Sequence, residues 1–400
     1  MRVSQEAEDF FENWGVLRAA VEAGASDLHL VDNSRPMARI RGELVPIDDV
    51  VLGTEHMYHL LKFLTEGPMM AKFYEPELLE DLDHTVEFGS LDRRFRVNIF
   101  RQNDGVSIVM RTLSQDVRDF ERLGIPAGFA RVADERSGLV LVTGVTGSGK
   151  STTLASIIEL INTRYRRHVI TIEDPIEVVF KNRLSLIEQR EVGSHTASFH
   201  DALRSALRQA PDVVLVGEIR DGETARMALR AAQVGVLVLA TLHTRSATES
   251  VGRLVNLFDD SIRMGARQQI ADCLRATLCQ MLIPARDRKS MVPCCELMWG
   301  TTAVRHLIRD DKTYLLHSLM EIASKDGMIT MEQSLLRAFR EGKISLESAY
   351  DYANDKPTFL SQLEPNLHKE LQIHWETDVE LKRLEALRET AKRQSNIRNQ

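Results

Sequence analysis

Residues 138–153, GLVLVTGVTGSGKSTT, contain the spacing of a phosphate-binding loop. An apolar run leads into the pattern G-x-x-x-x-G-K-[ST], and a stretch with helical apolar spacing follows it. In such a loop the backbone N–H groups turn toward phosphate oxygens, and the helix start adds a positive dipole end. Lys150 can reach the β- and γ-phosphates, and the Ser151 hydroxyl can coordinate Mg²⁺. The residues predicted to contact a nucleoside triphosphate are Gly144, Thr146, Gly147, Ser148, Gly149, Lys150, Ser151 and Thr152.

Carboxylates follow two further apolar runs of the chain. Glu173, Asp174 and Glu177 come at or after the end of the run 168–173, and Glu218 follows a later run. Hydrolysis of a γ-phosphate needs a group that orients the attacking water or accepts its proton, and a carboxylate can do either. A surface glutamate at a strand end, or a carboxylate that caps the next element, is the alternative.

A single histidine, His243, follows the apolar run 236–241. A neutral or protonated imidazole at this place can sense the γ-phosphate. The spacing alone equally allows a histidine with a purely structural role, which is the commoner case for a lone histidine.

The elements that must position these residues alternate between short apolar runs and helical stretches. The apolar runs are 139–142, 168–173, 213–216 and 236–241, and the helical stretches are 151–163, 198–209 and 223–233. This alternation predicts a parallel sheet with helices on both faces. The polar clusters all follow strand ends, where open α/β sheets bind ligands. Residues 262–355 are expected to be mostly helical.

The first 112 residues are predicted to form a separate small α/β domain. Helical spacing covers 10–21 and 56–65, and alternating strands are expected at 27–30, 38–40, 95–100 and 106–112. The strand pattern puts Arg94, Arg96, Arg101 and Arg111 on or beside sheet edges. A solvated basic face and a cluster that binds phosphate are both open.

Length and composition set the limits of these expectations. A chain of 400 residues with 43% hydrophobic and 27% charged residues predicts a globular protein of at least two domains. We expect domains at 1–112 and 123–355, a linker at 113–122 and a charged tail at 356–400. The net charge of −7 argues against nucleic-acid binding, and neither a signal peptide nor an apolar run of membrane-spanning length is expected. The four cysteines are expected to be buried free thiols.

Several further motifs together resemble one family of ATPases. TIEDPIE (171–177), VGEIRD (216–221) and TLHT (241–244) are similar to the Asp box, Walker B and His box of secretion ATPases. Within that superfamily the chain resembles the type IV pilus retraction ATPases, the PilT/PilU group. The other matching segments, within a resemblance that covers about residues 15–355, are ASDLHL (25–30), RFRVNIF (94–100), QREVG (189–193), ALRSALRQAPD (202–212) and TTAVRHLIRD (301–310).

The resemblance implies a fold and a set of roles. The fold class is α/β, with a PAS-like N-terminal domain and a RecA-like P-loop ATPase domain that has a helical C-terminal part. ATP, with Mg²⁺, would bind between the subunits of a homo-hexameric ring. By position Glu177 is the catalytic glutamate of the Asp box, Glu218 the Walker B glutamate and His243 the second histidine of the His box. Arg96 and Arg111 match N-terminal arginines that approach the phosphates.

The resemblance also implies a cellular task. The chain would power type IV pilus retraction and twitching motility by moving its two domains about the linker. It would lie in the cytoplasm, peripheral to the inner membrane, against a pilus platform protein and possibly a paralogous retraction ATPase. The alternatives are an accessory PilU-like subunit with weak turnover, a pilus-assembly or type II secretion ATPase and a nucleic-acid translocase. One departure from the family is Val236, which stands where the first His-box histidine is usual.

Overall fold

The computed structural model describes residues 3–40, 43–65, 81–103, 105–113 and 117–365, together with 367 and 371. Packing groups the chain into two compact units. The first consists of Met1–Asp119, Leu154–Ile219 and Arg226–Leu239, and the second of Phe120–Thr153, Arg220–Ala225 and Ala240–Gln400. The predicted domain boundaries stay a prediction. Part of the expected linker and most of the expected tail lie outside the described residues.

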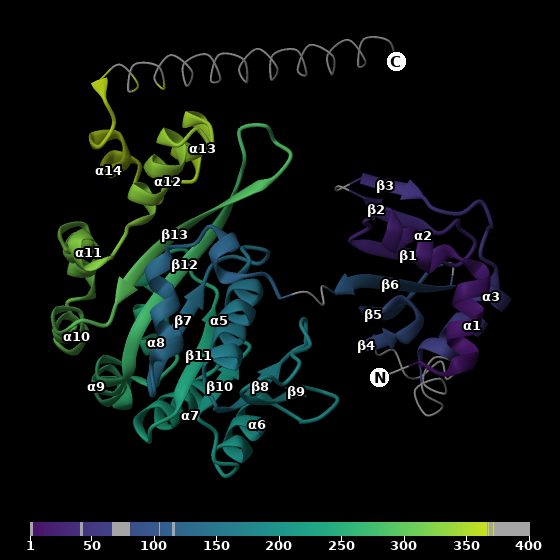
Figure 1. Ribbon diagram of the computed structural model, residues 1–400, viewed down its shortest axis with the longest axis horizontal. Helices are drawn as coiled ribbons and strands as arrows, with labels where there is room; N and C mark the ends of the chain where they lie inside the picture. Colours follow the sequence, from purple (N-terminus) through teal and green to yellow (C-terminus); the bar gives the residue numbers. More distant parts are fainter. Residues whose placement is uncertain are drawn as a thin grey trace, which may run out of the picture. The chain divides into compact units, whose positions relative to one another are not determined.

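The N-terminal region contains an antiparallel sheet in the order β3-β2-β1-β6-β5-β4 (Figure 1). Its elements are α1 (Gln5–Trp14), α2 (Val16–Glu22), β1 (Asp27–Val31), β2 (Met37–Ile40), β3 (Glu43–Pro46), α3 (Thr54–Leu64), β4 (Leu82–Phe88), β5 (Arg93–Gln102) and β6 (Gly105–Leu113). Side chains from the helices and the sheet share one buried apolar core, which includes Phe11, Leu60 and Phe95. The predicted strands are present, whereas β3 and β4 were not predicted.

Two details of this region differ from the sequence-based expectation. The single helix expected at 10–21 is two helices, because Gly15 has a φ of 74° and caps α1 in the left-handed conformation. The arginines expected at sheet edges lie on β5 and β6 or at their ends, and these are interior strands of the sheet.

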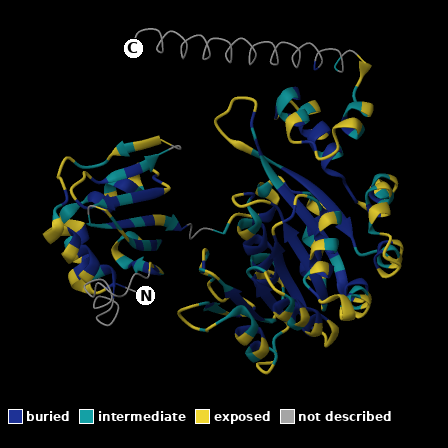
Figure 2. Ribbon diagram, turned by 180° about the vertical axis from the view of Figure 1, so that it is seen from behind, coloured by how far each residue is buried: buried dark blue, intermediate teal, exposed yellow. Residues whose placement is uncertain are grey.

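The second sheet carries the nucleotide motifs and has the order β13-β12-β7-β11-β10-β8-β9. Its strands are β7 (Gly138–Thr143), β8 (His168–Glu173), β9 (Leu186–Glu191), β10 (Val213–Val216), β11 (Leu237–Leu242), β12 (Leu274–Pro284) and β13 (Met291–Trp299). The helices between them are α5 (Lys150–Arg164), α6 (Phe199–Ala206), α7 (Gly222–Gln233), α8 (Ala247–Asn256) and α9 (Arg263–Cys273). Every residue of β7, β10 and β11 is buried, as the dark blue strands of Figure 2 show.

The prediction that 262–355 is mostly helical holds for α9 but is wrong for the segment that follows it, 274–299. β12 and β13 form a long antiparallel hairpin, and β12 also pairs in parallel with β7. The sheet is therefore mixed, where a parallel sheet was expected. Nearly all of β12 is buried or half-buried, so its side chains do not alternate in polarity and the pattern cannot separate strand from helix. In this hairpin Cys279 lies opposite Glu296, and Gln280 opposite Cys295.

Helices follow the hairpin up to the end of the described chain. They are α10 (Thr302–Arg309), α11 (Leu316–Ile322), α12 (Met331–Arg340), α13 (Leu346–Asp351) and α14 (Lys356–Ser361). Short 3-10 helices occur at Gly89–Leu91, Phe120–Leu123, Ala127–Asp134, Asp260–Ile262, Thr313–Leu315 and Ala323–Asp326. The four cysteines are buried free thiols, as expected. Across the described residues, none of the helices combines the length and apolarity that a membrane crossing requires.

Candidate nucleotide-binding site

The predicted phosphate-binding loop lies between β7 and α5 and packs closely on β12. Gly144 has a φ of 143°. A Cβ atom at this position would overlap the carbonyl oxygen of Gln280 and lie 2.5 Å from Ser148 Oγ. Any residue larger than glycine would therefore push the loop away from β12. The start of α5 at Lys150 then directs its first backbone N–H groups toward the loop.

The side chains of the loop suit an anionic ligand. Lys150 Nζ donates to the carbonyl oxygens of Gly144 and Val145, at 2.9 and 3.0 Å. Ser148 Oγ is buried and has no hydrogen-bond partner within the described part of the chain. Ser151, with the hydroxyl oxygen that Mg²⁺ favours as a ligand, is exposed at the start of α5. A triphosphate could bind three kinds of group here: the backbone N–H donors, the Ser148 hydroxyl and the Lys150 ammonium. The remaining predicted contact residues are the exposed Thr146 and Gly147 and the half-buried Gly149 and Thr152.

Gln280 of β12 supports this loop from beneath and was not predicted. Its side-chain oxygen accepts a hydrogen bond from the buried Thr153 hydroxyl at 2.8 Å. Its side-chain nitrogen lies 2.7 Å from the point that a Cβ atom on Gly149 would occupy. One buried amide therefore fixes both the last glycine of the loop and the first turn of α5.

Buried hydroxyl groups link the end of β7 to the His-box loop. Ser250 Oγ donates to Thr143 Oγ1 at 3.2 Å, and it lies 2.7 Å from Thr244 Oγ1. His243 precedes Thr244 and is exposed. The backbone on either side of His243 is thus anchored by β11 and by this buried network, while the imidazole faces outward. Val236, the departure from the family pattern, is 6% exposed and lies just before β11.

β8 ends at Glu173, whose carboxyl group has a perturbed pKa, and the acidic loop, residues 174–180, follows it. Burial raises the pKa of the Glu173 carboxyl to about 7, although hydrogen bonds from Thr171 and Gln189 act in the opposite direction. The Thr171 hydroxyl donates to Glu173 at 2.6 Å, and the Gln189 amide at 3.2 Å. Glu177, four residues later, is exposed. Glu173 therefore exchanges protons near neutral pH, whereas Glu177 lies in water.

Side chains from β9 hold the acidic loop. Gln189 donates to the Val178 carbonyl oxygen at 2.8 Å and accepts from Phe180 N–H at 2.9 Å. Glu191, which is 5% exposed, accepts a hydrogen bond from Ile176 N–H at 3.0 Å. The sequence signalled these residues only as part of the segment QREVG.

Glu218 lies just after the end of β10, beside the acidic loop that follows β8. β10 and β8 are parallel neighbours, and Gly217 N–H donates to the Ile172 carbonyl oxygen at 2.7 Å. Gly217 also packs closely on this neighbour, since a Cβ atom there would lie 3.3 Å from Glu173 Cα. The half-buried Glu218 thus follows a strand end at the same edge of the sheet as Glu173 and Glu177. The strand order places β7, β11, β10 and β8 next to one another.

Arg96 and Arg111 lie directly opposite each other on β5 and β6 of the N-terminal sheet. Arg96 makes a bidentate ion pair with Asp83, in which Nε lies 2.9 and 3.1 Å from the two carboxylate oxygens. Arg111 Nε donates to Asp27 at 2.8 Å, and its side chain is 63% exposed. The hydrogen bond with Asp83 raises the pKa of Arg96. Both guanidinium groups are therefore held in place by carboxylates.

Comparisons with known proteins agree with the motifs. The family model described as "Type II/IV secretion system protein" matches residues 12–341. The type IV pilus retraction ATPase PilT of Pseudomonas aeruginosa is 40% identical over 344 residues, covering 86% of this chain and 98% of PilT. PilU, a type IV pilus ATPase of the same organism, is 33% identical over 346 residues, which are 85% of this chain and 89% of PilU.

A solved structure gives the same result at the level of the fold. The crystal structure of the pilus retraction motor PilT with bound ADP has a TM-score of 0.80 and 38% sequence identity, covering 86% of this chain and 97% of that one. The chain therefore belongs to the type II/IV secretion ATPase family, and within it to the PilT/PilU group. The predicted fold class is confirmed: an N-terminal α/β domain and a RecA-like P-loop ATPase domain.

Proposed function

We propose that this protein is an ATP-hydrolysing motor that powers type IV pilus retraction, and with it twitching motility. The observation that carries the proposal is the loop at 144–151, in which Lys150, an orphaned hydroxyl and the start of α5 suit a triphosphate. The 40% identity to a pilus retraction ATPase over nearly its whole length supports the cellular task.

In this proposal each motif has one role in the reaction. The backbone of the loop and Lys150 bind the β- and γ-phosphates, and Ser151 is the ligand offered to Mg²⁺. When bound, Mg²⁺ neutralises part of the charge on the phosphates. Glu177 orients or deprotonates the attacking water, Glu218 supports the same step, and His243 responds to the presence of the γ-phosphate.

We further propose that the chain works as a homo-hexameric ring with ATP between its subunits. Arg96 and Arg111 would then contact the phosphates of a neighbouring subunit. Because each already has a carboxylate partner, phosphate binding requires the guanidinium groups to share or exchange it. The ring would act in the cytoplasm, against a platform protein at the inner membrane and possibly together with a paralogous ATPase.

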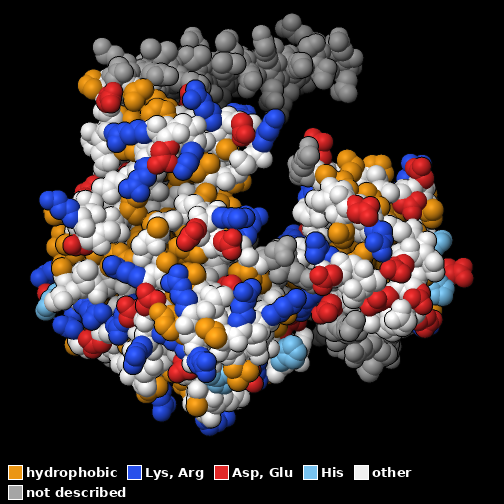
Figure 3. Space-filling view, in the orientation of Figure 1, with side chains coloured by type: hydrophobic (Ala, Val, Ile, Leu, Met, Phe, Trp, Pro, Cys, Tyr) orange, Lys and Arg blue, Asp and Glu red, His pale blue; other side chains and the backbone are white. Residues whose placement is uncertain are grey.

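One observation favours a second candidate function, an accessory PilU-like subunit with weak turnover. The family's first His-box histidine is replaced by the buried Val236, which offers no proton or charge to couple nucleotide state to movement. A nucleic-acid translocase has less support. On the face shown in Figure 3, basic and acidic side chains are interspersed over the described surface. A pilus-assembly or type II secretion ATPase shares the same motifs and is a further alternative.

The decisive experiment measures ATP turnover of the purified chain and its mass with a non-hydrolysable ATP analogue. A hexamer that turns over ATP is expected for the motor. A hexamer that binds the analogue but releases no phosphate would favour the accessory subunit. Retraction is tested separately, by expressing the chain in a piliated strain that lacks its retraction ATPase; unrestored twitching despite turnover would argue against the retraction role.

A further inference from the structure

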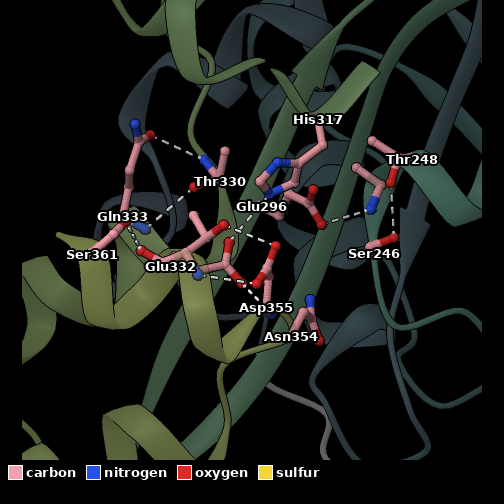
Figure 4. Close-up of polar contacts among 12 residues, drawn as sticks. Ser246, Thr248, Glu296, His317, Thr330, Glu332, Gln333, Asn354, Asp355 and Ser361 are labelled. Atoms are coloured by element: carbon pink, nitrogen blue, oxygen red, sulfur yellow. Dashed lines mark hydrogen bonds and ion pairs between the residues drawn. The ribbon is translucent and has the colours of Figure 1, made fainter. Parts of the chain in front are cut away.

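A cluster of polar contacts, which contains the buried Glu296 and Glu332 and the exposed Asn354, joins the C-terminal helices to the loop that carries His243. Figure 4 shows its members, which come from β13, α8, α11, α12 and the segment before α14. None of these residues belongs to a predicted motif. All of them lie within the second compact unit.

The first contact is between Glu296 of β13 and the start of α8. Glu296 is 1% exposed, and its Oε2 accepts a hydrogen bond from Ala247 N–H at 2.8 Å. Ala247 is the first residue of α8, and only three residues separate it from His243. A carboxylate at a helix N-terminus is favoured by the exposed N–H groups and the helix dipole.

The second contact is between Asn354 and the same loop. Asn354 Nδ2 donates to the carbonyl oxygen of Arg245 at 3.1 Å. Glu296 and Asn354 thus hold the two peptide groups on either side of Ser246, the N-cap residue of α8. The loop is held from two directions, by β13 and by the C-terminal segment.

Glu332 of α12 fixes the segment that contains Asn354. It is 1% exposed, and its Oε1 accepts a hydrogen bond from Asp355 N–H at 2.9 Å. His317 Nε2 of α11 lies 3.4 Å from the other oxygen of this carboxylate. Asp355 in turn caps α14 by accepting from Thr358 N–H at 3.0 Å. The position of Asn354 therefore depends on α11, α12 and α14 together.

Burial and the neighbouring charges of this cluster shift the pKa of the Glu296 carboxyl. Burial raises the pKa of the Glu296 carboxyl to about 7, and the nearby Glu332 carboxylate adds to this, whereas the Ala247 N–H and His317 act against it. Glu249 of α8 also raises it slightly. Burial of a carboxyl group has a free-energy cost unless its hydrogen bonds are satisfied.

We propose that Glu296 and Asn354 are positioning residues that set the loop carrying His243, so that the C-terminal helices control the rate of ATP turnover. The inference rests on the proposed ATPase function. It assigns the C-terminal helices a part in the reaction without any contact with the nucleotide. A change in the packing of α11, α12 or α14 would move Asn354 and, through its hydrogen bond with Arg245, displace the loop that carries His243.

The test compares ATP turnover of the full chain with that of four variants. Glu296→Ala removes the acceptor for Ala247 N–H, and we expect kcat to fall about tenfold, because small displacements of reacting groups are costly. KM for ATP should stay within about twofold, because the phosphate-binding loop is not altered. Glu296→Gln keeps an acceptor oxygen of the same size and should restore most of the rate. Asn354→Ala should lower kcat about threefold.

The matched control is Ser361→Ala, whose hydroxyl bonds within its own helix, to the Thr358 carbonyl oxygen at 2.7 Å. It should keep the wild-type rate. Hydrogen exchange supplies a second readout: the amides of residues 243–250 should exchange faster in Glu296→Ala and Asn354→Ala, while those of 144–150 stay unchanged. If Glu296→Ala does not fold, Asn354→Ala decides.

Two results would overturn the inference. One is wild-type kcat in folded Asn354→Ala and Glu296→Ala, even if their melting temperatures fall, since the contacts would then be only stabilising. The other is a rise in KM for ATP with unchanged kcat. A wild-type chain that shows no turnover would instead overturn the proposed ATPase function, and this inference with it.

Discussion

The phosphate-binding loop after β7 and the acidic loop after β8 are held in place by different means. The first loop is held by contacts within its own motif and by β12: Lys150 donates to carbonyl oxygens of its own loop, Gly144 allows close packing on β12, and Gln280 of β12 binds Thr153. The second loop is held by side chains from β9. Gln189 binds two backbone groups of the acidic loop, and Glu191 binds a third.

The two loops are therefore sensitive to different substitutions. In the phosphate-binding loop the motif that would bind the ligand also makes most of the loop's own contacts, and β12 adds the support of one side chain, Gln280. The acidic loop depends on residues 9 to 15 positions away. The carboxylates that we propose to be catalytic can therefore be displaced by substitutions that touch no ligand and leave nucleotide binding intact.

The largest effect is expected at the first loop. Lys150→Ala removes the cation that we propose to bind the β- and γ-phosphates, so turnover should fall about 100-fold or more and ATP affinity should weaken. Phosphate release and nucleotide binding, measured on the same preparation, would check this. The control is Lys289→Ala in the exposed turn between β12 and β13, which should behave as wild type. An active Lys150→Ala protein would refute the assignment of the loop.

A smaller effect is expected at the strand end beside the second loop. Glu218→Gln keeps the size of the side chain but removes its charge, and turnover should fall about tenfold or more while ATP still binds. Turnover and binding of a fluorescent nucleotide distinguish the two effects. Near-wild-type turnover would remove Glu218 from the reaction and leave Glu177 as the proposed catalytic carboxylate, which Glu177→Gln then tests in the same assay.

Gln189 supports the acidic loop without contacting the phosphate-binding loop, so its substitution separates the two loops most directly. Gln189→Ala removes two hydrogen bonds to the backbone of the acidic loop, and each contributes about 1 kcal/mol. We expect a kcat roughly fivefold lower, because Glu177 is then less well positioned, with an unchanged KM for ATP. Gln268→Ala, which alters an exposed contact with Asp272, is the matched control. A raised KM with unchanged kcat would mean that the two loops are not supported independently.

Substitution of Glu173 is expected to affect turnover least. Its main effect is on the pH dependence of the free energy of unfolding. The pKa of Glu173 is about 7 in the folded chain and 4.5 ordinarily, so the folded state holds more protons between these pH values. Stability from this group is complete below pH 4.5 and is lost as the pH rises toward 7, by on the order of 3 kcal/mol at most. Glu173→Gln cannot ionise and should flatten this decline. Urea unfolding at pH 5 and pH 7.5 measures it, and parallel curves for the two proteins would contradict the prediction.

The sequence predicted what is local. The phosphate-binding loop, the strands that precede each motif and the family all follow from short segments, because glycine spacing and apolar runs determine them. Val236 was identified as a departure in the same way. The structure adds that it is buried, which periodicity cannot tell for a residue between a helix and a strand.

What could not be predicted is what depends on distant partners. Gln280 meets Thr153 across 127 positions, and no spacing rule connects them. The hairpin β12–β13 was expected to be helical because burial on both faces removes the alternation that marks a strand. Nothing in the sequence distinguishes Glu296 from an exposed charged residue, and only the fold shows that it is buried against α8.

That hairpin has a mechanical consequence. Gln280 on one of its strands holds the start of α5, and Glu296 on the other holds the start of α8. The two residues are one step apart in the register, since Cys279 lies opposite Glu296. Adjacent strands are about 4.8 Å apart, so the hairpin joins the start of α5, beside the phosphate-binding loop, to the start of α8, beside the loop that carries His243. A small displacement of the hairpin would therefore shift the starts of α5 and α8 together.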